Sequence, residues 1–154
     1  VTGVQTCALP ILSAGFKVWK VTVVIDPGSV VNPNIVKQQV ESAVLQGLGA
    51  AMWDDVWFTQ GEPKRKNFNT YKMLRLKDAP VINTVILQSG APIGGIGEPG
   101  LPPIAPAVAN AIAKLTSTRL RSLPFAPQPV APVVLPLKAE LYAPFQPLIA
   151  LWLK

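Results

Sequence analysis

Two residue types that serve catalysis and metal binding are missing or scarce in this sequence. Its 154 residues contain no histidine and a single cysteine, Cys7. The absence of histidine excludes a Ser-His-Asp triad and most zinc sites within the chain. One cysteine excludes an intrachain disulfide framework and a CxxC metal site. The commonest general base and the commonest metal-binding patterns are therefore removed together.

Charge is also scarce, and long apolar runs are absent. Charged residues make up 14% of the chain and apolar residues 49%, whereas about 25% charged is typical of globular domains. This composition excludes a charge-rich disordered chain and fits a piece of a larger buried assembly better than a free-standing domain. The longest uncharged stretch, residues 79–97, contains two prolines and four glycines, so we expect no membrane span.

The charge that is present is mostly positive and partly clustered. The net charge is +6, and six of the 14 basic residues lie within residues 64–77. One interpretation is a solvated surface loop. The other is a non-catalytic basic module that binds an anionic partner such as nucleic acid. No helix-turn-helix, zinc-finger or RRM signature accompanies the cluster.

Both ends of the chain differ from its middle. Residues 1–11, VTGVQTCALPI, have no helical or strand period and match the translation of a short-read sequencing adapter codon by codon. We expect them to be an artefact outside the fold, which makes the chain a C-terminal fragment of a longer protein. Residues 126–154 are proline-rich and apolar. They are either a tail that wraps a partner or a second artefact, such as a frame-shifted reading.

Periodicity in the middle of the chain, residues 12–125, predicts an α+β fold with mixed strands and two main helices. Asn34 is the predicted N-cap of the first helix. Valines spaced four apart mark the buried face of that helix, and Gly47 and Gly49 favour close packing against a neighbour. The expected strands are residues 18–26, 56–59 and 81–88, the helices residues 35–53 and 103–115, and a glycine-rich loop spans residues 89–100.

One carboxylate stands out in the glycine-rich loop. Glu98 is the only acidic residue between Asp78 and Glu140, and it precedes an apolar helix. A carboxylate enclosed by apolar groups has a raised pKa and can act as a base near neutral pH. Flanking glycines allow backbone amides to approach a ligand closely. The alternative is an acidic residue that the dipole of the following helix stabilises.

Four motifs then follow one another in a specific order. They are D-x-G-x-x-V-N-P at residues 26–33, Q-V-E-x-x-x-x-Q-G-L-G at 39–49, N-x-x-T-Y-K at 67–72 and G-I-G-E-P at 95–99. Together they resemble the C-terminal end of the molybdopterin-binding large subunit of the xanthine dehydrogenase and aldehyde oxidase family. The segments NFNTYKMLRLKDAP, GGIGEPGLPPIAPAVANAI and RLRSLPF are most similar to the isoquinoline 1-oxidoreductase β-subunit type. The resemblance covers residues 18–125.

The resemblance implies roles for four residues. The glutamate of the G-x-G-E-P motif is the catalytic base of that family, and Glu98 occupies its position. The first glutamine of the helix motif binds the pterin, which indicates Gln39; the alternative is a solvent-facing helix residue. Gly95 and Gly97 would bring backbone close to the cofactor, the alternative being a simple turn. No residue of this chain is expected to ligate a metal.

The resemblance also implies a cofactor and partners. The cofactor would be molybdenum–molybdopterin in a dinucleotide form, and electrons would pass to 2Fe–2S clusters on a small partner subunit. The substrate would be an N-heteroaromatic compound or an aldehyde, with water as the oxygen source. Residues 12–125 would form an incomplete subdomain, inactive without the missing N-terminal part of the large subunit. The compartment would be the cytoplasm or, after export in the folded state, the periplasm of a bacterium.

Two positions depart from the family pattern. Ser42 follows the helix glutamate where the family commonly has glycine, and Pro27 follows the strand aspartate where a small residue is frequent. Neither departure removes a proposed functional group.

Overall fold

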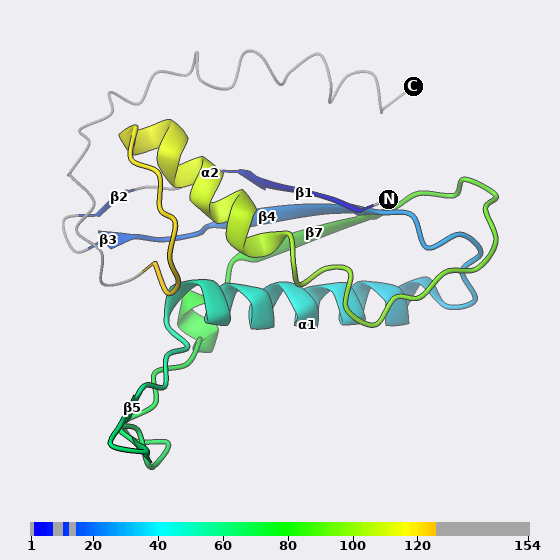
Figure 1. The fold of residues 1–154 in the computed structure, drawn as a ribbon. Coiled ribbons are helices and arrows are strands. Elements are labelled where there is room, and N and C mark those ends of the chain that lie inside the picture. Colours follow the sequence, from blue (N-terminus) through cyan, green and yellow to red (C-terminus); the bar gives the residue numbers. More distant parts are fainter. Residues whose placement is uncertain (1, 8–10, 13–14, 126–154) are drawn as a thin grey trace.

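The computed structural model describes residues 2–7, 11–12 and 15–125, and its centre is a three-stranded sheet (Figure 1). The strand order is β1–β4–β7. The central strand β4 (Lys20–Ile25) pairs antiparallel with β1 (Thr2–Cys7) and parallel with β7 (Val81–Ile86). The helices α1 (Pro33–Met52) and α2 (Ile104–Thr116) pack on one face of this sheet. The predicted α+β class with two main helices is confirmed.

The described N-terminal residues form short paired strands. Residues 2–7, which we expect to derive from an adapter, form the edge strand β1, with Thr2 opposite Ile25 and Cys7 opposite Lys20. This pairing does not test their origin, which stays a prediction. A second short pair joins β2 (Ile11–Leu12) to β3 (Gly15–Phe16). The predicted proline-rich tail, residues 126–154, lies outside the described residues.

Alternation along β4 decides which face of the sheet is covered. Val21, Val23 and Ile25 are buried, while the residues between them are partly exposed. This is the period of two expected for a strand with one face against a core. The strands predicted at residues 18–26 and 81–88 are therefore confirmed, with slightly shorter bounds.

The N-terminus of α1 differs from its prediction. Asn32, not Asn34, is the N-cap, because its Oδ1 accepts hydrogen bonds from the backbone N–H groups of Asn34 (3.0 Å) and Ile35 (3.3 Å). Pro33 then occupies the first helical position, where its fixed φ suits the helix and no N–H is needed. The predicted cap was wrong by two residues because the proline was assigned to the preceding loop.

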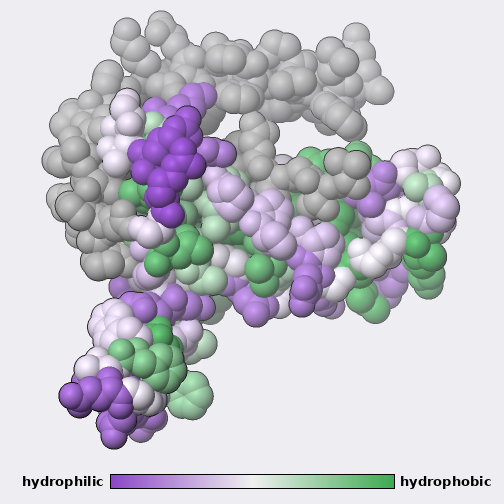
Figure 2. All heavy atoms as spheres, viewed as in Figure 1, coloured by the Kyte–Doolittle hydropathy of each residue, from purple (hydrophilic) through white to green (hydrophobic). Residues whose placement is uncertain are grey.

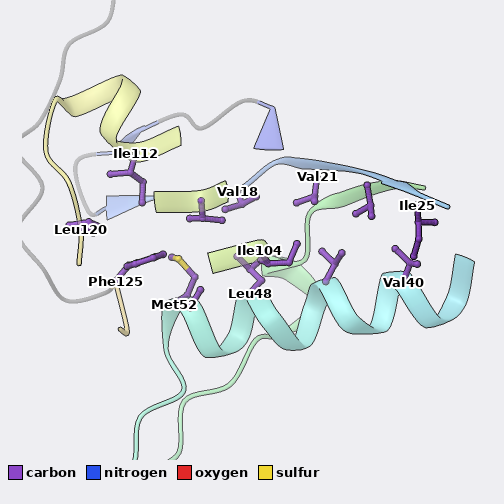
Figure 3. Packing of buried hydrophobic residues seen from close by; sticks show 14 of the residues in the cluster. Val18, Val21, Ile25, Val40, Leu48, Met52, Ile104, Ile112, Leu120 and Phe125 are labelled. Carbon is purple, nitrogen blue, oxygen red and sulfur yellow. The ribbon is translucent and has the colours of Figure 1, made fainter. Parts of the chain in front are cut away.

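The core lies between the sheet and the two helices (Figure 3). Its α1 side consists of residues four apart, as predicted: Val36, Val40, Val44 and Leu48. Gly47 lets α2 approach, because a Cβ there would lie 2.8 Å from the Leu101 carbonyl oxygen. The α2 side consists of Ile104, Val108 and Ile112. Phe125 closes one end of the core, and its N–H donates to the Ala51 carbonyl oxygen (2.8 Å).

A hairpin projects from the C-terminal end of α1; we call residues 54–75 the arm (Figure 1). It contains the short strands β5 (Phe58–Thr59) and β6 (Glu62–Pro63), and the 3₁₀ helix η1 (Leu76–Asp78) follows it. Gln60 and Gly61 turn the hairpin with positive φ angles of 53° and 79°. Figure 2 shows apolar and hydrophilic surface mixed on the arm, which exposes Trp57, Phe58, Phe68 and Met73.

In the described part of the chain, no helix is both long and apolar enough for a membrane span.

Candidate functional site

The glycine-rich loop leaves β7 and then follows the side of α1. A Cβ at Gly100 would lie 3.1 Å from the Ala43 Cβ and 3.5 Å from the Val40 carbonyl oxygen. One turn further along α1, the Leu101 carbonyl oxygen packs directly against Gly47. The loop therefore lies against helix positions four residues apart, which form one stripe on α1. Sequence reasoning missed Gly100, although a glycine just before an apolar helix is a signal for such an approach.

The loop and α1 also meet through a side chain. The Gln39 Nε2 donates to the Gly97 carbonyl oxygen at 2.6 Å, across 58 positions in the sequence. Both residues are exposed. The structure thus brings three of the predicted site residues together, since Glu98 follows Gly97 directly. A shared cofactor site requires this neighbourhood, and the role of Gln39 toward a cofactor stays a prediction.

Glu98 lies on the surface of the described residues. Its side chain is exposed there, so no apolar pocket within this part of the chain encloses it, and enclosure by the rest of the large subunit stays a prediction. Its backbone carbonyl accepts from the Leu101 N–H (2.9 Å). The first turn of α2 contains no acidic residue, so Glu98 lies beyond the range over which the helix dipole acts strongly. The dipole alternative therefore receives no support from the structure.

Gly95 and Gly97 have open space around them. A Cβ at either position would meet no atom within 4 Å among the described residues, and neither residue has a positive φ. Neither turn geometry nor packing in this part of the chain requires glycine there. The backbone at these positions is open to an approaching ligand, and their contact with a cofactor stays a prediction.

Two polar residues to which the sequence analysis gave no role lie at the start of the loop. Asp26 and Ser89 follow the carboxyl ends of β4 and β7. Asp26 Oδ1 accepts from the Ser89 hydroxyl (2.9 Å) and from the Gly28 N–H (3.1 Å). These hydrogen bonds hold the pKa of Asp26 below its ordinary value, and the bond from Ser89 has the larger effect. The carboxyl ends of parallel strands are frequent ligand sites in α/β sheets. The D-x-G pattern is a signal for the local Asp26–Gly28 contact, whereas nothing in the sequence indicates Ser89.

The available groups suit an organic cofactor. Within the described residues, no three His, Cys, Asp or Glu side chains lie close enough to hold a metal ion. The site offers a carboxamide, open backbone and one exposed carboxylate. A pterin edge needs hydrogen-bond donors and acceptors together, and a glutamine side chain supplies both. The hydrogen-bonding groups of these residues are therefore of the kind that a pterin needs.

Known proteins are similar to this chain in sequence. A family model for the molybdopterin cofactor-binding domain matches residues 8–80. The chain is 39% identical over 103 residues to isoquinoline 1-oxidoreductase subunit beta of Brevundimonas diminuta, covering 67% of this chain and 13% of that protein. The chain belongs to the molybdopterin-binding xanthine dehydrogenase family. It is also 36% identical over 129 residues to a membrane-bound aldehyde dehydrogenase of Gluconacetobacter polyoxogenes, covering 84% and 15%. The name of that enzyme includes pyrroloquinoline quinone.

Solved structures of molybdenum enzymes share the fold. Quinoline 2-oxidoreductase from Pseudomonas putida 86 superposes with a TM-score of 0.65 at 24% identity, covering 73% of this chain and 16% of that one. The aldehyde oxidoreductase from Desulfovibrio desulfuricans superposes with a TM-score of 0.60 at 26% identity, covering 73% and 13%. The chain thus spans about one seventh of the length of these family members.

Proposed function

We propose that this chain forms one wall of the cofactor site of a molybdenum hydroxylase. The enzyme would oxidise an N-heteroaromatic or aldehyde substrate with water as the oxygen source. The observation that carries this proposal is the 2.6 Å hydrogen bond from Gln39 to the Gly97 carbonyl, which joins the helix motif to the glutamate motif. The names of the relatives agree with this substrate range, since they include isoquinoline, quinoline and aldehyde oxidoreductases.

The chain's own residues would divide the work at the site. Molybdenum held by the dinucleotide form of molybdopterin supplies the two-electron oxidation when it is bound. Gln39 uses one Nε2 hydrogen for the Gly97 carbonyl, so its second N–H and its Oε1 would serve the donors and acceptors of the pterin edge. Glu98 accepts the proton of the water that becomes the product oxygen. Gly95 leaves room for the backbone to approach the cofactor.

The rest of the enzyme would complete this wall. The described Glu98 side chain is exposed, so we propose that the missing N-terminal part of the large subunit covers it and excludes bulk water. The chain contains one cysteine, too few for an iron–sulfur cluster. Electrons would therefore leave through 2Fe–2S clusters on a small partner subunit.

The basic cluster gives less support to a nucleic-acid-binding function. Arg65 covers the ring of Trp57 at 5.5 Å, and Lys72 covers that of Trp53 at 5.4 Å. Lys66 pairs with Glu62 at 2.8 Å. Half of the six basic residues are thus engaged within the chain, and the cations occupy ring faces on which bases would stack. The basic module therefore ranks below the enzyme.

Glu98→Gln in the full-length enzyme tests the proposal. We expect turnover to fall by about 10²-fold or more, because the proton acceptor is lost, while the molybdenum content stays unchanged. Glu62→Gln on the exposed arm is the matched control and keeps full turnover. Unchanged turnover of the Glu98→Gln enzyme at full metal loading would refute the assignment. Metal and pterin analysis of the same preparations separates molybdopterin from pyrroloquinoline quinone as the cofactor.

A further inference from the structure

The two loops that follow β4 and β7 are joined by side-chain and backbone hydrogen bonds. Asp26 Oδ1 accepts from the Ser89 hydroxyl at 2.9 Å. The Ser89 oxygen in turn accepts from the Ala91 N–H at 3.2 Å. The Gly94 N–H donates to the Pro27 carbonyl oxygen at 2.8 Å. We call this set of contacts the Asp26 junction.

Close packing accompanies the Asp26 junction. Gly28 has a φ of +73°, and a Cβ there would lie 2.1 Å from the Pro92 carbonyl oxygen and 2.7 Å from that of Ala91. Real Cβ atoms do not approach backbone oxygens this closely. The backbone of one loop thus lies directly against the backbone of the other, and only glycine fits at the contact.

The glycine-rich loop is consequently held at two points. The first is the bond from Gly94 to Pro27, and the second is the bond from Gln39 to Gly97. Only Gly95 and Ile96 lie between these points. Glu98 follows the second point directly, so the path of the chain through Gly94 limits where the Glu98 backbone can lie.

We propose that Asp26 is a positioning residue, which acts through Ser89 to fix the start of the glycine-rich loop and hence the placement of Gly97 and Glu98. Asp26 would act through its bonds to Ser89 and Gly28 and not by contact with the substrate or the cofactor. The importance of Asp26 for catalysis rests on the proposed function. Its effect on the position of the glycine-rich loop does not depend on that function. A purely local role, in which Asp26 only stabilises the turn at Gly28, predicts no effect on Ala91 or Gly94.

Hydrogen–deuterium exchange of the 154-residue chain tests the positioning directly. The Ala91 and Gly94 amides report on the loop because both donate hydrogen bonds at the Asp26 junction. We expect these two amides to exchange about threefold to tenfold faster in Asp26→Ala and in Ser89→Ala, because each variant removes one partner of a charge-assisted hydrogen bond. The amide of Val23 in β4 should keep its protection in both variants.

Two further variants make this test specific. Asp26→Asn keeps an Oδ1 acceptor for Ser89 and Gly28, so it should restore slow exchange. Ser29→Ala removes an exposed hydroxyl next to the junction and serves as the matched control. Unchanged exchange at Ala91 and Gly94 in both Asp26→Ala and Ser89→Ala would overturn the proposal. If Asp26→Ala unfolds the sheet, exchange at Gly94 in Ser89→Ala decides, because Ser89 is itself the acceptor of the Ala91 N–H.

The full-length enzyme separates this inference from the proposed function. We expect Asp26→Ala to lower kcat about tenfold and Asp26→Asn to restore it, because the Asn keeps the loop in place. If Asp26→Ala loosens the loop while kcat stays unchanged in both Asp26→Ala and Glu98→Gln, then the proposed function fails and the structural junction remains. If Glu98→Gln abolishes turnover but Asp26→Ala alters neither exchange nor kcat, the positioning role is refuted and the proposed function stands.

Discussion

The glycine-rich loop and the arm are both long connections beside α1, yet they are held in opposite ways. The loop is fixed by residues distant in sequence, through Gln39 at one point and Asp26 and Pro27 at the other. The contacts described inside the arm are mostly local, such as the i,i+4 pair of Lys66 and Glu62. A site that needs fixed geometry belongs on backbone that the core positions. The loop therefore suits the proposed chemistry better than the arm, which is the less constrained region.

Substituting Gly28, which packs against the glycine-rich loop, and Gly61, which lies in the arm, should give the largest contrast. Gly28 and Gly61 both have positive φ angles, 73° and 79°, but a Cβ at Gly61 would meet nothing within 4 Å. Gly61→Ala should therefore cost only backbone strain, about 1 kcal/mol. Gly28→Ala adds a clash with backbone and should cost about 3–5 kcal/mol. Urea unfolding of the two variants measures the difference.

Equal costs for the two glycine variants would contradict the comparison. A small cost at Gly28 would mean that the loop yields to a methyl group and is not fixed by the Asp26 junction. A large cost at Gly61 would mean that the arm unfolds together with the core. In either case the contrast between the two regions would disappear.

The end of α1 nearest the loop offers a smaller, equally well-matched test. Asn32→Ala removes the side-chain acceptor for the Asn34 and Ile35 N–H groups and should cost about 1 kcal/mol in unfolding free energy. Asn34→Ala changes the residue that sequence alone indicated as the cap, and it should cost nearly nothing. Thermal unfolding of both variants distinguishes them. A larger loss in Asn34→Ala would contradict the capping assignment.

Much of the fold follows from the sequence, because local patterns carry it. The period of two in β4 and the valines four apart in α1 predict these elements and their buried faces. The contacts that build the site are not local, since 58 positions separate Gln39 from Gly97 and 63 separate Asp26 from Ser89. No periodicity encodes such a pairing. The surroundings of Glu98 are not encoded locally either, because they depend on which segments pack over it.

A pH titration should show how the base of the arm is held. Burial first, and then the charge of Asp54 and a hydrogen bond to it, raise the pKa of Tyr71 above 10.0. A raised tyrosine pKa means that the contact stabilises the fold below pH 10 and is lost as the pH rises through the folded-state pKa. Asp54→Asn should lower the pKa of Tyr71 toward 10. NMR titration of the tyrosine ring carbons measures it.

The control for this titration is Asp55→Asn. Asp55 is next to Asp54, but its carboxylate does not contribute to the raised pKa of Tyr71. The pKa of Tyr71 should stay raised in that variant. If Asp54→Asn leaves the pKa of Tyr71 unchanged, burial alone accounts for the shift and this pair does not hold the base of the arm together.

The smallest expected effect concerns the ion pair on the arm. Lys66 Nζ and Glu62 Oε2 lie 2.8 Å apart, with side chains 66% and 70% exposed. Solvent screens such a pair, so Lys66→Ala should change the unfolding free energy by less than about 0.5 kcal/mol. The result is informative because it is small. A loss above about 1 kcal/mol in urea unfolding would mean that the arm's local contacts are part of the cooperative core. Its five basic residues would then be held as firmly as the glycine-rich loop, and the weak constraint that separates the arm from the site would no longer hold.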